Sequence, residues 1–487
     1  MFDATETDTK AREAPPARTI ETDICILGAG SGGLSVAAGA AQMGVRVVLI
    51  EGAEMGGDCL NHGCVPSKAL IAAAHHAHAM ETGAPYGVAP VPAQVDYARA
   101  KDHVARAIAT IAPHDSQERF EGLGVTVIRA WGRFVSEREV RAGDALIRAR
   151  RFVIATGSRP FMPPIAGLDT VPVHTNETVF ALRERPEHLI VVGGGPIGME
   201  MAQAHRRLGS RVTVIEGARA LGRDDPEAAA LVLEALREEG VDIREGAAVE
   251  RVSGVEGAIT VKAGGEEVTG THLLVAAGRR VDVAGLGLES AGVRHDRAGV
   301  KVDAALRTSN RRVYAIGDAA GQGQFTHLAG YHAGVILRAM LFGLPAKAKG
   351  AHIPRATYTD PELAQVGATE AEARKRHGAR LEVVRAEFAQ NDRAVAEGRT
   401  AGFVKVMVVG GRPVGATIVG AQAGEQIALW SLAIANRMKM SAISHAVLPY
   451  PTRMEASKRA AGAYFTPRLF ENRTVKRVVG FVQRFLP

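Results

Sequence analysis

Cysteine, aromatic residues and long apolar stretches are scarce in this chain. It has 3 cysteines in 487 residues, too few for the disulfide framework of a secreted scaffold. Aromatic residues make up 5%, so base-stacking platforms are not expected, and a net charge of +7 is weak evidence for nucleic-acid binding. The sequence has no run of about 18 apolar residues, so no transmembrane helix is predicted, and residues 1–20 show no secretory signal. We therefore expect a cytoplasmic protein that does not bind nucleic acid.

Glycine, by contrast, is abundant. It accounts for 55 of the 487 residues, roughly 11%, against a usual share of about 7%. Apolar residues at 46% and charged residues at 23% are typical of a globular protein, and the length predicts roughly three domains. The excess of glycine indicates phosphate-binding loops and tight turns between strands and helices.

An internal repeat contains many of these glycines. Residues 22–52 (TDICILGAGSGGLSVAAGAAQMGVRVVLIEG) align with residues 187–217 (EHLIVVGGGPIGMEMAQAHRRLGSRVTVIEG) at a shift of 165 positions. Each copy reads as an apolar strand, a glycine turn, a helix and a second strand that ends in an acid. The matched pairs are Gly28 and Gly193, Gly30 and Gly195, Gly33 and Gly198, Gly44 and Gly209, and Glu51 and Glu216.

The spacing within each copy fits a dinucleotide site. The first glycine of such a motif makes the tight turn, the second lets the backbone approach a pyrophosphate, and the third lets the helix pack on the strand. The acid follows 23 positions after the first glycine in both copies, which suits a contact with ribose hydroxyls. One GxGxxG alone can be merely a turn, but two copies with matching acids favour two dinucleotides, a flavin and a nicotinamide.

The second acid bears on which nicotinamide binds. Glu216 would repel a 2′-phosphate and accept a hydrogen bond from a 2′-hydroxyl. Arg219 is the one arginine in the segment that follows it. We therefore expect FAD and NADH as cofactors, with NADPH less favoured.

A cysteine pair follows the first copy. Cys59 and Cys64 are separated by four residues and precede a helix-like stretch from Ser67, so both sulfurs can come within disulfide reach. A thiol near the start of a helix has a lowered pKa, which favours the reactive thiolate. A buried structural pair and half of a zinc site are the alternatives. Zinc would need two more ligands and the usual CxxC spacing is absent, so we predict no metal site.

Other nearby candidates have simpler interpretations. Cys25 lies inside the first strand and is expected to be a small buried residue. The neighbouring histidines are more typical of a solvated or packed helix face than of metal ligands: His62, His75, His76 and His78.

Five segments together resemble one known family. GGDCLNHGCVPSKAL (56–70) is similar to the redox-active disulfide segment of the class I pyridine nucleotide–disulfide oxidoreductases, which include dihydrolipoamide dehydrogenase, glutathione reductase and mercuric reductase. The resemblance extends from about residue 20 to 465. The other four segments that carry it are RFVIATGSRP (151–160), LLVAAGRRVD (273–282), VYAIGDAAG (313–321) and IPRATYTDPELAQVG (353–367).

The resemblance implies an α/β fold with two Rossmann-like dinucleotide-binding domains, for FAD and NAD(P), and a C-terminal α+β dimerisation domain. It also implies a homodimer, because the family's acid–base residue comes from the partner subunit. The expected boundaries are an N-terminal arm (1–20), an FAD-binding domain in two parts (21–158 and 283–350), an NAD(P)H-binding domain (159–282), a dimerisation domain (351–465) and a basic amphipathic tail (466–487).

The same resemblance implies a chemistry. Hydride from NADH would pass through FAD to a Cys59–Cys64 disulfide and then to a small-molecule or protein disulfide, or another soft acceptor. Cys64 would be the charge-transfer thiol beside the flavin, and Cys59 the interchange thiol. Lys68 would lie near the flavin and pair with Glu200; without the match they would be an ordinary helix cation and an exposed helix acid. The remaining implied cofactor-binding positions are Gly57, Gly132, Thr156, Gly157, Gly278, Asp318 (at the ribityl chain) and His327.

One position departs from the family pattern. Disulfide-reducing members carry His-Pro-Thr-x-x-Glu near the C-terminus, whereas LPYPTRMEASKRAAG (448–462) has Tyr450 in place of the histidine and keeps the glutamate as Glu455. Histidine titrates near neutrality, but tyrosine has a reference pKa of about 10 and is a poor base at pH 7. We expect Glu455 to accept a hydrogen bond from the phenol. Oxidation of dihydrolipoamide should then be slow, and reduction of an acceptor by the thiolate pair less affected.

Two alternative functions stay open. The tyrosine in this region resembles the pattern of mercuric reductase, which reduces a metal ion. That enzyme has a second cysteine pair at its C-terminus, however, and here no cysteine follows Cys64. The other alternative is a flavoprotein subunit of a redox or membrane complex with little turnover of its own. The tail keeps it open, since it has five Lys or Arg against one acid, Glu471, and an apolar helical face that would lie on a membrane or pack on its own protein. That face consists of Val475, Val478, Val479, Val482 and Phe485.

Overall fold

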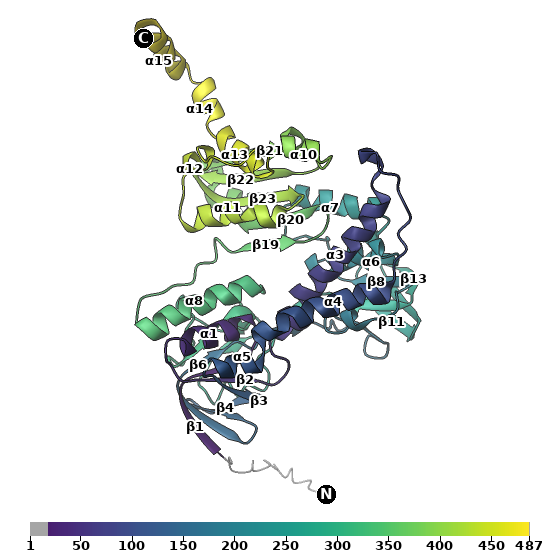
Figure 1. The fold of residues 1–487 in the computed structure, drawn as a ribbon, viewed down its shortest axis with the longest axis vertical. Helices are drawn as coiled ribbons and strands as arrows, with labels where there is room; N and C mark the ends of the chain where they lie inside the picture. Colours follow the sequence, from purple (N-terminus) through teal and green to yellow (C-terminus); the bar gives the residue numbers. More distant parts are fainter. Residues whose placement is uncertain (1–17, 487) are drawn as a thin grey trace, which may run out of the picture. The chain divides into compact units, whose positions relative to one another are not determined.

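The computed structural model of the chain describes residues 18–486, which form two compact units (Figure 1). Unit 1 takes the described residues up to Gly57 together with 112–158 and 281–348. Unit 2 takes 58–111, 159–280 and the described residues from Lys349 onward. Residues 1–17 of the expected arm lie outside the described residues, and residues 18–20 begin strand β1. The segment 58–111, which we expected in the FAD-binding domain, packs within unit 2.

Unit 1 is built on a seven-stranded sheet. Five strands run parallel, and β4 and β5 extend the sheet as antiparallel strands. The strands are β1 (Arg18–Leu27), β2 (Val47–Glu51), β3 (Thr126–Arg129), β4 (Gly132–Ser136), β5 (Glu139–Ala142), β6 (Ala145–Ile154) and β18 (Val313–Ala315). The other elements of the unit are α1 (Ser31–Ala41), η2 (Ala112–Asp115), α5 (Gln117–Gly122), β16 (His295–Asp296), β17 (Gly299–Val300), η4 (Gly317–Ala320) and α8 (Thr326–Phe342).

Alternation along β1 gives this sheet two apolar faces. Ile24 and Ile26 point into the cluster formed with α1 and α8, and Cys25 and Leu27 point into the cluster formed with β4 and β5. Cys25 is fully buried, as expected, and burial raises the pKa of its thiol. The sheet therefore holds the end of β1, where the glycine turn begins, between two packed layers.

The second repeat forms a parallel sheet in unit 2. Its strands read as continuous apolar runs because helices or a second sheet cover both faces. The four strands are β8 (His188–Val192), β9 (Arg211–Ile215), β10 (Asp242–Arg244) and β14 (His272–Val275), with an antiparallel layer of β11 (Val249–Val255), β12 (Ala258–Ala263) and β13 (Glu266–Gly270). The helices are α6 (Pro196–Arg207) and α7 (Pro226–Glu238); Asp225 caps α7 by accepting two backbone N–H groups.

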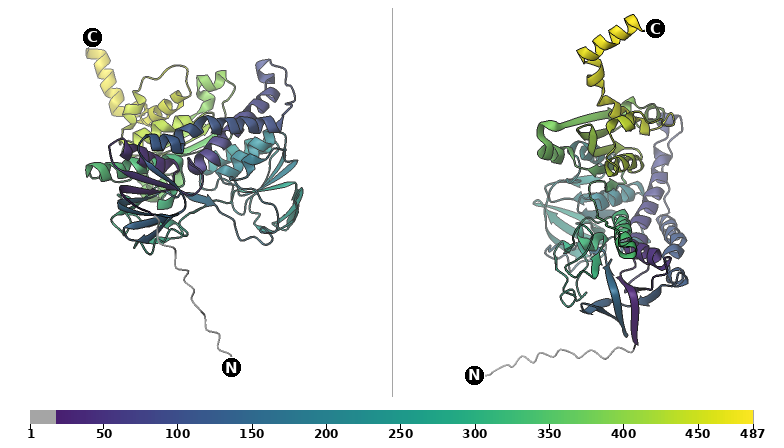
Figure 2. Two further views of the ribbon diagram at one scale, coloured as in Figure 1. Left: turned by 60° about the horizontal axis from the view of Figure 1, so that its bottom comes forward. Right: turned by 90° about the vertical axis from the view of Figure 1, so that its left-hand side faces the viewer.

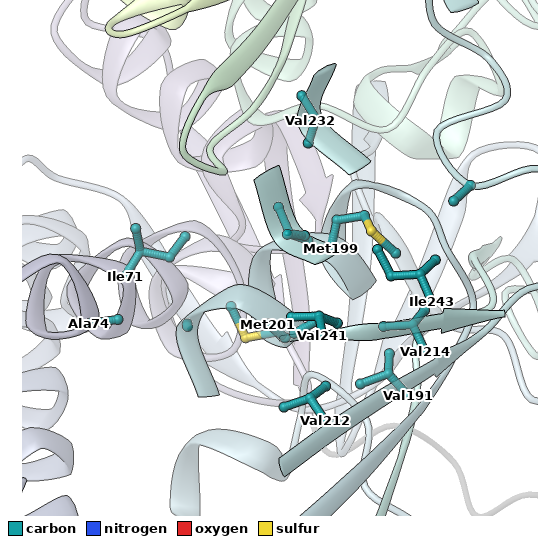
Figure 3. Close-up of a cluster of buried hydrophobic side chains, with 14 of the residues drawn as sticks. Ile71, Ala74, Val191, Met199, Met201, Val212, Val214, Val232, Val241 and Ile243 are labelled. Atoms are coloured by element: carbon teal, nitrogen blue, oxygen red, sulfur yellow. The ribbon is translucent and has the colours of Figure 1, made fainter. Parts of the chain in front are cut away.

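Helix α6 links this sheet to the helix that carries Cys64. Figure 3 shows Met201 on α6 between strand residues such as Val212 and the helix that contains Ile71 and Ala74. That helix is α3 (Cys64–Glu81), which also packs against α4 (Tyr97–Ile111). The cysteine segment is thus fixed to the same core as the second dinucleotide motif.

The C-terminal part of unit 2 is a five-stranded antiparallel sheet with helices on it. Its core is centred on Trp430, whose indole N–H donates to Ser457 Oγ at 3.0 Å. The strand order is β19 (Pro354–Thr357), β20 (Glu362–Gly367), β23 (Arg412–Gly420), β22 (Phe403–Val409) and β21 (Leu381–Glu387). The helices are α9 (Glu370–His377), α10 (Asp392–Ala396), α11 (Ala423–Ala435), α12 (Met440–Ser444), α13 (Met454–Ala463), α14 (Thr466–Phe470) and α15 (Arg473–Phe485); the last two follow α13 at the C-terminal end (Figure 2).

These arrangements confirm the expected fold class, two α/β dinucleotide-type folds and an α+β C-terminal part. Short elements complete unit 2 or lie where the chain crosses between the units: α2 (Gly57–Asn61), η1 (Ala84–Tyr86), β7 (Ser158–Pro160), η3 (Val179–Ala181), β15 (Arg279–Val281), η5 (Gly378–Arg380) and η6 (Phe388–Gln390). Among the described residues, no helix is both long and apolar enough to span a bilayer.

A buried polar group joins α4 to the second fold. Lys101 is 2% exposed, and its Nζ donates to the Val179 carbonyl at 2.9 Å. Nearby, the Tyr97 phenol lies 3.1 Å from Nε2 of His205, whose Nδ1 donates to the Met201 carbonyl. That donation leaves Nε2 as the acceptor for the phenol. Burial, and then the charge of a neighbouring arginine, lower the pKa of Lys101 to about 7.

The lowered pKa of Lys101 predicts a pH-dependent stability. The unfolded chain has a lysine pKa of about 10.4 and binds the proton more tightly than the folded chain between pH 7 and 10.4, so this group's contribution to stability rises with pH in that window. Between pH 7 and about pH 9.5, the unfolding free energy of wild type should therefore rise by about 2–3 kcal/mol relative to that of Lys101→Met.

Urea unfolding followed by circular dichroism, at both pH values, measures this difference. The exposed Lys262→Met serves as the control, and its difference from wild type should not change with pH. If the difference between Lys101→Met and wild type is equally constant, the pKa of Lys101 is not lowered in the folded chain.

Candidate active site

The first dinucleotide motif closes a tight turn in unit 1. Gly28 follows β1 with φ +105°, and a Cβ atom there would lie 2.4 Å from the carbonyl oxygen of Ala155. A Cβ atom on Gly33 would lie 1.9 Å from the Gly28 oxygen. Both contacts are shorter than van der Waals packing allows, so glycine is required at both positions. Helix α1 follows the N-cap Gly30 without a side-chain cap or an acid in its first turn, which leaves its N–H groups for a phosphate.

The acid at the end of β2 is tied to this turn. Glu51 is 9% exposed, and its two carboxylate oxygens accept the backbone N–H groups of Ala29 at 2.6 Å and Ala53 at 2.7 Å. The carboxylate is therefore held beside the glycine turn in one orientation. This cradle fits a dinucleotide with a ribose next to its pyrophosphate.

The second motif repeats the geometry in unit 2. Gly193 has φ +114°, and a Cβ atom there would lie 2.5 Å from the carbonyl oxygen of Ala276. A Cβ atom on Gly198 would lie 2.0 Å from the Gly193 oxygen. Helix α6 follows the N-cap Gly195, again without a side-chain cap or an acid in its first turn, although its first residue, Pro196, has no backbone N–H. The two turns therefore present a similar backbone surface to a phosphate.

Glu216 is held as Glu51 is. One carboxylate oxygen accepts the Gly194 N–H at 2.7 Å, and the other accepts the Ala218 N–H at 2.9 Å. The negative charge stays at the end of β9, where a dinucleotide on this turn would place its adenosine ribose. The second cradle also fits a dinucleotide.

Six further flavin candidates lie in unit 1, at the ends of strands or the starts of helices, whereas Lys68 lies in unit 2. Asp318, in η4, accepts a hydrogen bond from Ser158 Oγ at 2.6 Å. The Thr156 hydroxyl donates to the Asp282 carbonyl at 2.7 Å. The remaining positions are Gly57 at the start of α2, Gly132 at the start of β4, Gly157 after β6 and His327 in the first turn of α8.

The two cysteines lie on consecutive helices. Cys59 is half-buried on α2, and Cys64 is exposed as the first residue of α3, three residues earlier than the expected helix start. Helix α3 has no acid in its first turn, so its N-terminal dipole favours a thiolate at Cys64. Ser67 follows one turn later, with its hydroxyl donating to the Cys64 carbonyl at 3.2 Å.

Asp58 anchors the segment between them. One of its carboxylate oxygens accepts a hydrogen bond from Asn176 Nδ2 at 2.9 Å, and the other lies 3.2 Å from Arg279 Nη2. Asn176 also donates to the His62 carbonyl at 3.0 Å. Two residues distant in sequence thus hold the backbone on both sides of Cys59.

Lys68 and Glu200 form an ion pair one helical turn beyond Cys64. Lys68 Nζ lies 2.7 Å from one oxygen of Glu200, which is 5% exposed. The other Glu200 oxygen accepts the Tyr358 N–H at 2.9 Å, and Lys68 Nζ lies 4.5 Å from the centre of the Tyr358 ring. In the first repeat the position matching Glu200 is Ser35, so the acid is particular to the second copy.

Tyr450 has a different partner from the expected one. Its phenol donates to Asp392 Oδ2 at 2.8 Å, not to Glu455, which lies in the first turn of α13. The hydrogen bond to Asp392 and the charge of that carboxylate raise the pKa of Tyr450 further above its ordinary value. The side chain is 70% exposed. Tyr450 is therefore held as a neutral hydrogen-bond donor on the surface of unit 2.

The candidate residues divide between the units. Unit 1 holds the first glycine motif and the strand-end flavin candidates, and unit 2 holds the cysteines, the ion pair, the second glycine motif with Gly278, and Tyr450. Among residues 18–486, no group of three or more His, Cys, Asp or Glu side chains is arranged to hold a metal ion.

Sequence analysis missed several residues that position this chemistry. Asp58, Arg279 and Tyr358 lie inside three of the segments already singled out, so their positions were a visible signal. Asn176 and Asp392 had no such signal, because only the fold brings them to their partners.

Two sequence families match the chain. The family described as pyridine nucleotide-disulphide oxidoreductase matches residues 22–333, and its dimerisation domain matches residues 353–461. A mercuric reductase of Acidithiobacillus ferrooxidans is 33% identical over 91% of this chain and 83% of its own length. A dihydrolipoyl dehydrogenase of Thermus scotoductus is 35% identical over 91% of this chain and 97% of its own length.

Solved structures show the same likeness. The HOCl-induced flavoprotein disulfide reductase RclA from Escherichia coli superposes with a TM-score of 0.81 at 29% identity, covering 90% of this chain and 99% of its own. LpdA from Mycobacterium tuberculosis superposes with a TM-score of 0.83 at 25% identity, covering 91% of this chain and 99% of its own.

The ion pair beside the cysteine segment predicts energetic coupling. Lys68→Met leaves the buried Glu200 carboxylate without its cation and should cost about 3 kcal/mol in unfolding free energy. Glu200→Gln keeps an acceptor for the Tyr358 N–H and should cost about 1 kcal/mol. The double variant should be more stable than the sum of the single changes, by about 1–3 kcal/mol.

Unfolding free energies of the three variants and wild type, from urea titrations, measure this coupling. Lys458→Met, on α13, controls for loss of a lysine elsewhere. Single-variant effects that add to within about 0.5 kcal/mol would show that the two charges act independently.

Proposed function

This chain belongs to the pyridine nucleotide–disulphide oxidoreductase family, and on that premise we propose that it is an NADH-dependent, FAD-containing reductase. In this proposal, electrons from NADH open a disulfide between Cys59 and Cys64, and the resulting thiols reduce a small-molecule or protein disulfide or another soft acceptor. The main support is one observation: the chain has two equally built dinucleotide cradles and a cysteine pair at the start of a helix.

The residues that would hold each cofactor follow from the cradles. Bound FAD and NADH supply hydride transfer, which no side chain provides. Glu216 favours NADH because its fixed charge would repel a 2′-phosphate. The nicotinamide would be held by Gly193, Gly195, Gly198, Glu200, Glu216 and Gly278, and the flavin by Gly28, Gly30, Gly33, Glu51, Gly57, Lys68, Gly132, Thr156, Gly157, Asp318 and His327.

The electrons and protons balance without a further reagent. NADH and one proton convert the Cys59–Cys64 disulfide to two thiols and release NAD⁺. The dithiol then exchanges with an acceptor disulfide, which leaves as two thiols while the Cys59–Cys64 bond re-forms. We assign Cys59 to this exchange and Cys64 to the flavin, because α3 begins at Cys64 and its dipole stabilises the thiolate that such a contact needs. Asp58, held by Asn176 and Arg279, keeps the segment in place through both states.

Tyr450 sets the favoured direction in this proposal. Thiol oxidation needs a base, and Asp392 keeps the phenol protonated. A protonated phenol can still donate a hydrogen bond to a departing thiolate. The site therefore suits reduction of an acceptor better than oxidation of dihydrolipoamide, with Glu455 left near the phenol as a second charge. Because the dimerisation domain supports a homodimer, we expect Tyr450 to act on the cysteine pair of the partner subunit.

A soft metal ion is the second candidate acceptor. The similarity to mercuric reductases favours it, but the chain has no cysteine after Cys64 to deliver such an ion. A screen with NADH against lipoamide, glutathione disulfide, coenzyme A disulfide, quinones and Hg(II) separates the two. Failure of every acceptor, with the cysteine pair still reduced by NADH, would favour a partner subunit with little turnover of its own. We place the reaction in a reducing cytoplasm, as the few cysteines indicate.

The assignment of the two thiols predicts distinct spectra. On anaerobic reduction with NADH, wild type should develop the long-wavelength absorption of a thiolate beside a flavin and expose two further thiols to iodoacetamide. Cys64→Ser should lose the band, whereas the matched Cys59→Ser should show it even before NADH is added, because Cys64 then has no disulfide partner. NADPH at the same concentration should act more slowly.

Thiol counting by mass spectrometry identifies the labelled residues. A band that survives in Cys64→Ser would reverse the assignment of the two cysteines. No gain of thiols with NADH, in protein that carries flavin, would disprove the redox role of the pair.

Restoring the family histidine predicts a change in activity. Tyr450→His should raise kcat for dihydrolipoamide oxidation at least about tenfold, because general-base catalysis contributes about 10²–10⁴-fold. Its rate should acquire a pH dependence near pH 6.5. Tyr450→Phe is the matched control and should show neither effect. A histidine variant that is no faster than the phenylalanine variant would show that the pocket, and not the proton acceptor, decides specificity.

A further inference from the structure

The C-terminal helix α15 exposes an apolar face. Asn472 caps the helix, since its side chain accepts the N–H groups of Thr474 at 2.9 Å and Val475 at 3.3 Å. Within the described chain, no residue of α15 is buried. Phe481 and Phe485 pack on each other with ring centres 4.8 Å apart, yet they are 62% and 61% exposed. The largest side chains of the helix thus lie on a face that the rest of unit 2 leaves exposed.

All the cations of α15 lie on the opposite face. At about 100° per residue, the apolar side chains span an arc of about 160°, and the four cations fall within an arc of about 100° centred on the other side. No acid occurs between Arg473 and the last described residue. The apolar arc consists of Val475, Val478, Val479, Phe481, Val482 and Phe485, and the cations are Arg473, Lys476, Arg477 and Arg484.

The preceding helix attaches this element to unit 2. Arg468 on α14 forms an ion pair with Glu382 at 2.6 Å, and its guanidinium lies 3.7 Å from the centre of the Tyr464 ring. The fifth cation of the tail is therefore used for anchoring, and the four on α15 are not paired with an acid of their own helix. Anchoring ends where the amphipathic helix begins.

From this arrangement we propose that α15 binds the surface of an anionic lipid bilayer. A helix that lies in a membrane interface buries its apolar face at the acyl boundary and keeps its cations among the headgroups, where anionic lipids attract them. A second copy of the chain would also cover the apolar face, but it would leave four cations on the far side without a role. The charge separation therefore favours the membrane. This inference does not depend on which acceptor the reductase uses.

Vesicle binding by the full-length holoenzyme tests it. Wild type should sediment with vesicles of about one-third phosphatidylserine in phosphatidylcholine, and binding should fall at least tenfold with phosphatidylcholine alone or when salt is raised from about 0.1 to 0.5 M. Phe481→Ser/Phe485→Ser removes the apolar anchor, and Lys476→Gln/Arg477→Gln removes half of the charge. Each should also reduce binding at least tenfold.

Two controls give the outcomes their meaning. Gln483→Ala, on the polar face, should bind like wild type, and acceptor reduction should be unchanged in all variants, since none of these residues belongs to the redox site. Wild type that fails to bind, or variants that bind as well as wild type, would overturn the proposal. Light scattering provides the second readout: if Phe481→Ser/Phe485→Ser dissociates the homodimer, the face is an interface between copies and the membrane assignment is wrong.

Discussion

Two close contacts between backbone segments, one in each glycine motif, shape both dinucleotide cradles. In each dinucleotide fold, the third glycine of the motif lies against the carbonyl oxygen of the first, nearer than any side chain permits. That contact holds the start of the helix close to the end of the strand, so the uncapped N–H groups are available to a phosphate at the turn. The strand-end carboxylates then fix the same turn from the other side. Without these contacts neither Glu51 nor Glu216 would be oriented for a ribose.

The cysteine segment depends on a different principle, clamping by distant polar groups. Asn176 and Arg279, which are distant from it in sequence, reach Asp58 and hold its carboxylate. Glu200 similarly takes a place that a serine fills in the first repeat, and uses it to hold Lys68 and the Tyr358 backbone together. The two repeats thus share one cradle geometry and differ at the position where the second copy has the acid that pairs with Lys68.

Tyr450, which departs from the family pattern, and the exposed helix α15 both bear on which acceptors and surfaces the protein would contact. Asp392 accepts the hydrogen bond of the phenol and raises its pKa, so the surface beside α10 offers a hydrogen-bond donor at Tyr450. On the two proposals made above, the reductase would act on acceptors near a bilayer surface. The two features are independent in structure, since α15 follows α14 and Tyr450 precedes α13.

The sequence alone determined the repeat, the two cradles, the cysteine pair and the amphipathic pattern of the tail, because each is local: turn geometry and helical periodicity are written in neighbouring residues. It also indicated that Tyr450 would be a poor base. Only the tertiary structure decided that the phenol pairs with Asp392 and not Glu455, that Asn176 and Arg279 hold Asp58, and that α15 buries none of its described residues. The polar contacts among them join residues up to 221 positions apart, as for Asp58 and Arg279, and no local pattern encodes which distant side chain a fold will bring within hydrogen-bond distance.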